Sequence, residues 1–250
     1  MILLSKPKKV CALLCLVFFL LEGASAGVCA PGRSASSQPS AALVTIESVN
    51  AAGPGVQKAG AYSGTAALFL SRNPGRIVKY ARSGSGVIID PRGILVTNAH
   101  IVRDAAGVSV KLFDGTRAEG RILQVIPETD IAFLSIVPPF PLAYVPLANS
   151  DGLLPGAKVY CMGHALDHNR SLFGGEVSAV LKQPAPQGVR PAFVQVRFGF
   201  HLYSGDSGSP ILDRKGYLLG LVSGGRRGGD NAALAIASNV IRDAYRTLPK

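Results

Sequence analysis

The sequence predicts an all-β fold in two antiparallel halves, followed by one C-terminal helix. Short runs of β-type residues recur along the chain, and turn signals such as Asp90-Pro91-Arg92-Gly93 separate them. No stretch of about 10–15 residues between these runs has helical periodicity, which argues against a parallel α/β sheet. The 29 glycines and 17 prolines among 250 residues suit a chain with many turns.

The first half is expected over about residues 42–137. Its strands are predicted at residues 42–49, 87–89, 94–97, 108–113, 121–126 and 131–137. Residues 50–64 are rich in Gly, Ala and Pro and predict a long loop. Pro138, Pro139 and Pro141 then interrupt the pattern, so we place the joint between the two halves there.

The second half is expected over about residues 142–232. Its strands are predicted at residues 157–162, 175–181, 193–198, 210–212 and 218–223. The terminal helix is predicted over residues 239–248, where apolar residues such as Val240, Ala244 and Leu248 share one face. Ser238 is expected to cap its N-terminus and Pro249 to end it.

The N-terminus has the layout of a secretory signal peptide, predicted over residues 1–26. Lys6, Lys8 and Lys9 precede an uncharged apolar run at residues 10–21, and cleavage is expected after Ala26. That run is too short to span a bilayer as a helix, which needs about 20 residues. We therefore expect export to the periplasm or the extracellular medium, with membrane contact only through this signal. A retained anchor and a lipid-modified Cys29 are the alternatives.

Residues 27–41 are rich in Ser, Ala, Pro and Gly and predict a flexible leader ahead of a domain at residues 42–250. Without the signal, the net charge falls from +11 to +9. No run of basic residues with interleaved aromatics is present, so nucleic-acid binding is not expected. Cys29 and Cys161 could pair in an oxidising compartment, but Cys161 lies in an apolar run that equally predicts a buried free thiol.

The residues that carry chemistry are a glycine-flanked serine, a histidine and an aspartate. Ser207 lies in the turn at residues 205–210, a string that by itself favours an ordinary tight hairpin turn. His100 directly follows a predicted strand, and Asp130 begins another. Each alone fits an ordinary core or turn residue. Together they predict nucleophilic catalysis, in which Ser207 attacks, His100 moves the proton and Asp130 orients His100.

The segments around these residues resemble trypsin-like serine peptidases of the HtrA/Deg type. The resemblance covers roughly residues 42–248. It is carried by residues 84–90, 93–102, 129–134 and 234–239. It implies the chymotrypsin fold, with two six-stranded antiparallel barrels and the active site in the cleft between them.

The same resemblance implies a serine endopeptidase that cleaves protein or peptide substrates through an acyl-enzyme. The backbone N–H groups of Gly205 and Ser207 would form the oxyanion hole, which holds the charge of the transition state. This chemistry needs no metal or organic cofactor. Two rivals remain: a catalytically silent binding protein with the same fold, and an esterase that uses the same three residues.

Three departures from the family limit what is carried over. The sequence ends at Lys250, so we expect the protease domain alone, without the PDZ domain that usually follows in HtrA proteins. Asp206 stands where many HtrA-type proteins have asparagine, whereas animal digestive enzymes also have aspartate there. In those enzymes the aspartate pairs with a new N-terminus that cleavage before an Ile-Val pair releases. Ile77 is too close to His100 in the sequence to reach this position, so zymogen activation of that kind is not expected. Val222 replaces the histidine with which bacterial glutamyl endopeptidases read glutamate, so glutamate specificity is not expected.

The substrate-binding residues are expected near the serine turn. By its spacing to Ser207, His201 would lie at the base of the specificity pocket, where trypsins keep an aspartate, so a preference for Lys or Arg is not expected. An ordinary barrel position remains the alternative for His201. Val222, Ser223 and Gly224 would form the pocket wall and pair with the substrate backbone. His164 and His168 lie in a loop-like segment, and we expect no metal site there.

Overall fold

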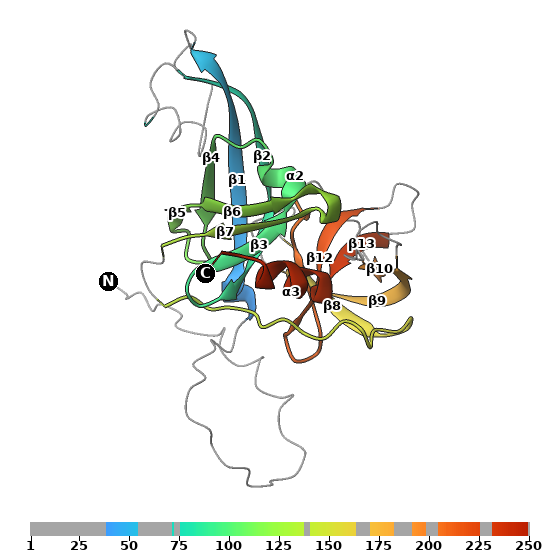
Figure 1. Cartoon of the computed structure of the whole chain (residues 1–250). Helices are drawn as coiled ribbons and strands as arrows, with labels where there is room; N and C mark the ends of the chain where they lie inside the picture. Colours follow the sequence, from blue (N-terminus) through green and yellow to red (C-terminus); the bar gives the residue numbers. More distant parts are fainter. Residues whose placement is uncertain are drawn as a thin grey trace, which may run out of the picture. The chain divides into compact units, whose positions relative to one another are not determined.

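The computed structural model describes residues 39–54, 72, 76–137, 141–163, 171–182, 192–198, 205–225 and 232–249 (Figure 1). All of them belong to the compact unit from Ala35 to Lys250. The predicted signal peptide, most of the leader, Cys29, His164, His168 and His201 lie outside the described residues. The structure confirms the all-β fold class, with a curved N-terminal sheet, a closed C-terminal barrel and a C-terminal helix.

The N-terminal sheet contains seven antiparallel strands. They are β1 (Leu43–Pro54), β2 (Arg76–Asp90), β3 (Ile94–Asn98), β4 (Gly107–Lys111), β5 (Arg117–Glu119), β6 (Arg121–Ile126) and β7 (Ile131–Ser135), in the order β5-β4-β1-β2-β3-β7-β6. Three short helical segments accompany them: η1 (Pro39–Ala42), α2 (Ala99–Val102) and η2 (Pro127–Thr129). The candidate residue His100 lies in α2, and Asp130 directly follows η2.

A glycine bend brings the two ends of this sheet together. The end strands β5 and β6 are consecutive in the chain and are separated only by Gly120, whose N–H donates to the carbonyl of Val108 at 2.9 Å. A Cβ at Gly120 would lie 3.1 Å from methyl groups of Val108 and Val110. The N-terminal sheet thus approaches the expected six-stranded barrel, with one strand bent into β5 and β6.

The C-terminal barrel is closed and has the six strands that the resemblance implies. They are β8 (Lys158–Gly163), β9 (Ser171–Lys182), β10 (Ala192–Phe198), β11 (Pro210–Leu212), β12 (Leu218–Gly225) and β13 (Ala232–Ala237). Strand β13 was not predicted from periodicity, because its alanine-rich sequence lacks alternation. Its burial explains this, since only Leu234 of the strand is partly exposed.

The core runs through both halves. Residues such as Leu95, Ile131 and Phe133 of the N-terminal sheet and Leu221 and Ile236 of the barrel are fully buried. Each such side chain contributes about 1.5–3 kcal/mol by leaving water. Strand β7 reads as a continuous apolar run because its side chains are covered on both faces.

Two local predictions are wrong. Residues 50–54 were expected in a loop but extend β1, where they pair with Arg76–Tyr80 of β2 beyond the reach of β4. Figure 1 shows this ribbon running past its neighbours. Ser238 does not cap the terminal helix α3 (Ser238–Arg246): Ala237 is the N-cap, and the Ser238 hydroxyl donates to the carbonyl of Ala148 at 2.8 Å.

Helix α3 is attached to the N-terminal sheet by Tyr245. The Tyr245 ring lies 5.9 Å from the Phe133 ring, centre to centre, and its hydroxyl donates to Oδ2 of Asp90 at 2.7 Å. Arg92 donates to the same carboxylate from Nε and a terminal nitrogen. These hydrogen bonds, that of Arg92 above all, lower the pKa of Asp90 to about 2.

Cys161 is a free thiol, fully buried on β8. Burial raises the pKa of this thiol. The interpretation as a buried free cysteine is therefore confirmed for this residue. Among the described residues, no helix is long and apolar enough to cross a membrane.

Candidate active site

His100 is the second residue of the short helix α2, directly after strand β3. The buried residues Ile101 and Val102 hold this helical turn, and the Ser48 hydroxyl donates to the carbonyl of Ile101 at 2.5 Å. The imidazole of His100 remains 45% exposed. The end of β3 therefore fixes the backbone of His100 and leaves its ring open to a reactant.

Asp130 faces His100 from the turn before β7. Its backbone is left-handed, with φ 57° and ψ 35°, a conformation that aspartate tolerates better than most residues. Its carboxylate oxygens lie 3.0 and 2.9 Å from Nδ1 of His100, and Oδ1 also accepts the His100 backbone N–H at 3.0 Å. The backbone carbonyl of Asp130 accepts the Ala99 N–H at 3.0 Å. Both backbone and side chain thus hold the two residues together.

A third group, the hydroxyl of Ser223 on β12, completes the surroundings of this carboxylate. It donates to Oδ2 of Asp130 at 2.6 Å. Burial by itself would raise the pKa of Asp130, but hydrogen bonds from His100 and Ser223 outweigh it, so this pKa lies below its ordinary value. Asp130 is therefore ionised at neutral pH and can hold the Nδ1–H of His100.

Ser207 occupies a tight turn between two glycines with positive φ. Gly205 has φ 111° and Gly208 has φ 86°, a backbone region that favours glycine. The Gly208 N–H donates to the carbonyl of Val222 at 2.7 Å, and the Ser209 N–H donates to that of Asp206 at 2.9 Å. The turn is thus built by its own backbone and by β12.

The serine turn belongs to the C-terminal barrel but is bound to the N-terminal sheet. The backbone N–H of Ser85, on β2, donates to the carbonyl of Ser207 at 2.7 Å. Ser223 makes the reverse connection, from the barrel to Asp130. The serine turn and Asp130 are therefore both bonded across the contact between the two halves.

Within the described part of the chain, the Ser207 hydroxyl makes no hydrogen bond to the imidazole. Catalytic hydrogen bonds of this kind are often long without substrate and shorten in the reacting complex.

Of the predicted pocket wall, Val222 and Ser223 have other contacts in the structure. Val222 bonds the serine turn in both directions, since its N–H donates to the carbonyl of Ser209 at 2.9 Å and its carbonyl accepts from Gly208. The pairing of β12 with β13 shifts register between Val222 and Gly224. This irregularity turns Ser223 toward Asp130, as bulges commonly re-aim a side chain. The sequence shows no signal for it, so the contact to Asp130 was missed.

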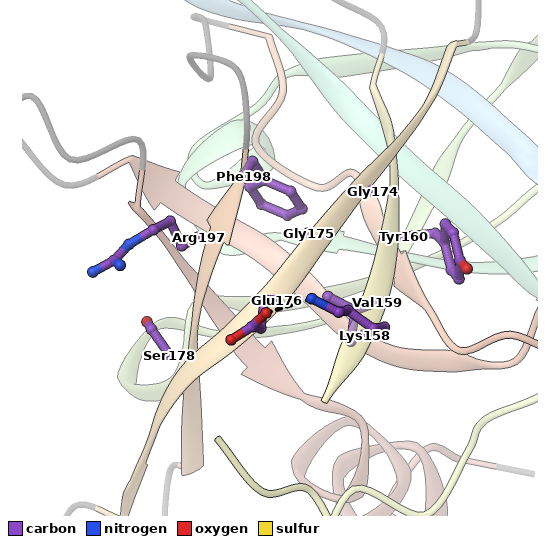
Figure 2. Close-up of a pocket in the computed structure, with 9 residues that line it drawn as sticks. All are labelled: Lys158, Val159, Tyr160, Gly174, Gly175, Glu176, Ser178, Arg197 and Phe198. Atoms are coloured by element: carbon purple, nitrogen blue, oxygen red, sulfur yellow. Dashed lines mark hydrogen bonds and ion pairs between the residues drawn. The ribbon is translucent and has the colours of Figure 1, made fainter. Parts of the chain in front are cut away.

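A hollow of about 550 Å³ lies elsewhere, over strands β8, β9 and β10 (Figure 2). Figure 2 shows Lys158 and Glu176 meeting across it, with Tyr160 and Arg197 on opposite sides. Nζ of Lys158 lies 2.5 Å from Oε2 of Glu176, and this hydrogen bond lowers the pKa of Glu176. None of the nine residues that line the hollow is a catalytic candidate, so we do not place the reaction there.

The described residues contain no group of three or more His, Cys, Asp or Glu side chains that could hold a metal ion. His201, predicted at the pocket base, lies outside them, as do the histidines of the loop-like segment 164–168. Serine, histidine and aspartate are residue types that carry out nucleophilic attack and proton transfer.

This chain is similar in sequence to several serine proteases. The periplasmic serine endoprotease DegP of Salmonella typhimurium is 30% identical over 175 residues, which cover 68% of this chain and 36% of the relative. The mitochondrial serine protease HTRA2 of Bos taurus is 32% identical over 155 residues, which cover 61% of this chain and 34% of the relative. The matched region thus spans less than half of the length of each relative.

Among solved structures, the HtrA-type protease AlgW with a tripeptide aligns with a TM-score of 0.65 at 21% identity. The alignment covers 85% of this chain and 62% of that chain. This likeness establishes the chymotrypsin-like fold. The sequence family described as a trypsin-like peptidase domain matches residues 84–221, a segment that contains His100, Asp130 and Ser207. Since this match spans more than half of the chain, the protein belongs to the trypsin-like peptidase domain family.

Proposed function

We propose that this protein is an exported serine endopeptidase that cleaves peptide bonds with Ser207, His100 and Asp130. The observation that carries the proposal is the carboxylate of Asp130, held on Nδ1 of His100 at 2.9 Å while the ring stays exposed. A histidine oriented by an ionised carboxylate beside a turn-borne serine is the arrangement that activates a hydroxyl for attack. Membership of a peptidase family supports the same chemistry.

In the first step, Oγ of Ser207 attacks the carbonyl carbon of the substrate and its proton passes to Nε2 of His100. Because Asp130 accepts the Nδ1–H, the neutral ring presents Nε2 as the acceptor. The negative charge on the substrate oxygen is held by the N–H groups of Gly205 and Ser207. Such donors act on charge that develops only in the transition state, and each is worth about 10²–10³ in rate.

The collapse of this intermediate breaks the peptide bond. His100 returns its proton to the leaving amine, and the acyl group stays on Ser207 as an ester. A water molecule then repeats the attack with His100 as base, which releases the acid and regenerates the serine. No metal or organic cofactor takes part in these steps.

Protein or peptide substrates are the class that the relatives support. The solved AlgW structure is described with a tripeptide, and DegP is named an endoprotease. Strand β12 would offer the backbone of residues 223 and 224 to an extended substrate, by the addition of a strand to the sheet. Export is supported by the N-terminal signal pattern and by the periplasmic location in the name of DegP.

The proposal is tested with a fluorophosphonate probe and casein. Wild-type protein should be labelled at Ser207 and should degrade casein, and Ser207→Ala should lose both. Ser209→Ala is the matched control: its hydroxyl is buried two residues away with no hydrogen-bond partner, so labelling should persist.

The same experiment separates the rival functions. A silent binding protein would leave wild-type protein unlabelled, which overturns the proposal. An esterase would be labelled and would hydrolyse nitrophenyl esters, but it would leave casein and a peptide library intact. Labelling of Ser207→Ala equal to wild type would place the nucleophile elsewhere.

A further inference from the structure

Ser85 on β2 binds the serine turn with both its backbone and its side chain. Its N–H donates to the carbonyl of Ser207 at 2.7 Å, and its hydroxyl donates to the carbonyl of Gly205 at 3.0 Å. Its own carbonyl accepts the hydroxyl of Thr97 at 2.7 Å. Ser85 is fully buried, so water does not compete for these bonds. Ser85, a residue of the N-terminal sheet, therefore binds the carbonyls of Gly205 and Ser207, the two neighbours of Asp206.

The approach of Ser85 to the turn is so close that it requires glycine at position 208. A Cβ at Gly208 would lie 1.9 Å from the carbonyl oxygen of Ser85. At Gly84 a Cβ would lie 3.1 Å from the carbonyl oxygen of Ser207, but its closest neighbour would be Cδ1 of Ile101 at 2.3 Å. The first of these distances is far inside van der Waals contact. The close contact between β2 and the serine turn therefore depends on the missing side chain of Gly208.

The two carbonyls that Ser85 holds belong to the peptide groups next to the proposed oxyanion donors. The carbonyl of Gly205 lies one Cα away from the N–H of Gly205, which is the first donor. In the same way, the carbonyl of Ser207 lies one Cα away from the N–H of Ser207, which is the second donor. Gly205, at φ 111°, has no side chain to restrict rotation of its peptide groups. A hydrogen bond to its carbonyl supplies the missing restraint.

We propose that Ser85 is a positioning residue that keeps the N–H groups of Gly205 and Ser207 aimed at the substrate oxyanion. The hydroxyl acts on Gly205 and the N–H on Ser207, so the half of the molecule that carries the base also sets the geometry of the oxyanion hole. This proposal rests on the proposed peptidase function and adds to it the residue that pre-organises the hole.

The test is Ser85→Ala, which removes the hydroxyl and keeps the N–H bond to Ser207. We expect kcat to fall about 10-fold to 100-fold with KM nearly unchanged, because misplacement of a catalytic group by about 1 Å costs up to about 10²-fold. A peptidyl trifluoromethyl ketone forms an oxyanion on binding, so its affinity should fall by the same factor as kcat. Amide hydrogen exchange of the segment 205–210 should become faster.

Ser238→Ala is the matched control. Ser238 is equally buried, and its hydroxyl also donates to a backbone carbonyl, that of Ala148, away from the site. It should lose similar thermal stability but keep wild-type kcat, inhibitor affinity and exchange at 205–210.

The outcomes separate this inference from the proposed function. If Ser85→Ala keeps the kcat, inhibitor affinity and hydrogen exchange of wild type, Ser85 does not position the hole and the inference is overturned. If wild-type protein is unlabelled and inactive, the peptidase function fails and the catalytic role of Ser85 fails with it. If the Ser85→Ala variant of such an inactive protein still showed faster amide exchange at residues 205–210, Ser85 would stabilise the turn without a role in catalysis.

Discussion

The carboxylate of Asp130 accepts hydrogen bonds from three groups that are distant in the sequence. They come from the backbone N–H and the ring of His100 and from the hydroxyl of Ser223. The pair of residues 100 and 130 belongs to the N-terminal sheet, whereas Ser223 belongs to the barrel. The carboxylate is therefore held by groups from both halves, and the backbone of Asp130 is in the left-handed region, which aspartate tolerates better than most residues.

At this residue, Asp130→Asn should remove the acceptor that fixes the tautomer of His100. The asparagine amide can donate to Nδ1, which would favour the form with a proton on Nε2 and block transfer from Ser207. We expect kcat on a peptide substrate to fall by about 10³–10⁴ with little change in KM. The measurement is a steady-state assay at neutral pH.

Asp104→Asn is the matched control, since Asp104 also has a left-handed backbone, with φ 64°, but is exposed. Its kcat should equal that of wild type. A fall in kcat of the same size in both variants would mean that the loss reflects backbone strain rather than the tautomer of His100.

At the scale of elements, the bend at Gly120 separates the two end strands of the N-terminal sheet, β5 and β6. The strands on its two sides pair with β4 and β7, and the glycine lies against the methyl groups of Val108 and Val110. Helix α3, at the other end of the chain, is attached to this sheet by Tyr245, whose hydroxyl donates to Asp90 at the turn between β2 and β3.

Gly120→Ala should destabilise the protein, because its Cβ would lie 3.1 Å from two valine methyls in a packed core. Overpacking of this kind costs about 1–3 kcal/mol of the free energy of unfolding. Urea unfolding monitored by circular dichroism measures the change. Gly152→Ala is the control: its Cβ would meet nothing within 4 Å, so the change should stay within about 0.5 kcal/mol. Equal midpoints for both variants would rule out the packing argument.

Tyr245→Phe should loosen α3 by one hydrogen bond while keeping the ring against Phe133. The loss of this hydrogen bond to Asp90 should lower the free energy of unfolding by about 1 kcal/mol. Tyr217→Phe, on a partly exposed residue, serves as the control and should leave the unfolding midpoint unchanged. If both variants unfold at the wild-type midpoint, the bond to Asp90 does not stabilise the helix.

At the scale of the whole molecule, side-chain contacts join the sequence-distant halves, among them three hydrogen bonds from hydroxyl groups. Ser85 holds the serine turn, Ser223 holds Asp130, and Tyr245 holds Asp90. Two of the three end on carboxylates whose pKa is lowered in the folded protein. The association of the halves and the ionisation of these groups are therefore linked.

This linkage predicts a loss of stability in acid. The pKa of Asp90 falls from 3.8 to about 2 on folding, so its contribution is complete above about pH 4 and is lost as the pH falls toward 2. Asp130, whose pKa is also lowered, acts in the same direction. The free energy of unfolding should therefore drop between about pH 4 and pH 2, and it should drop less in Asp90→Asn. Identical pH profiles for the two proteins would contradict the assignment.

Much of the fold was visible in the sequence, for identifiable reasons. The strands of residues 94–97, 121–126 and 210–212 are apolar runs bounded by turn residues, and the structure places strands there. β13 was missed because alanine carries little strand preference and its burial comes from neighbours in the barrel. The cap predicted at Ser238 failed because the carbonyl of Ala148, 90 residues earlier in the chain, takes its hydroxyl.

The sequence by itself determined the all-β class, the positions of most strands and the three candidate residues, because periodicity, turn chemistry and motif order are local properties of the chain. It also placed Ser223 and Gly205 near the site. Only the tertiary structure decided that Ser223 donates to Asp130 and that Ser85 donates to the serine turn. Both contacts depend on a strand irregularity and on a close backbone approach between residues more than 90 positions apart, which no local pattern encodes.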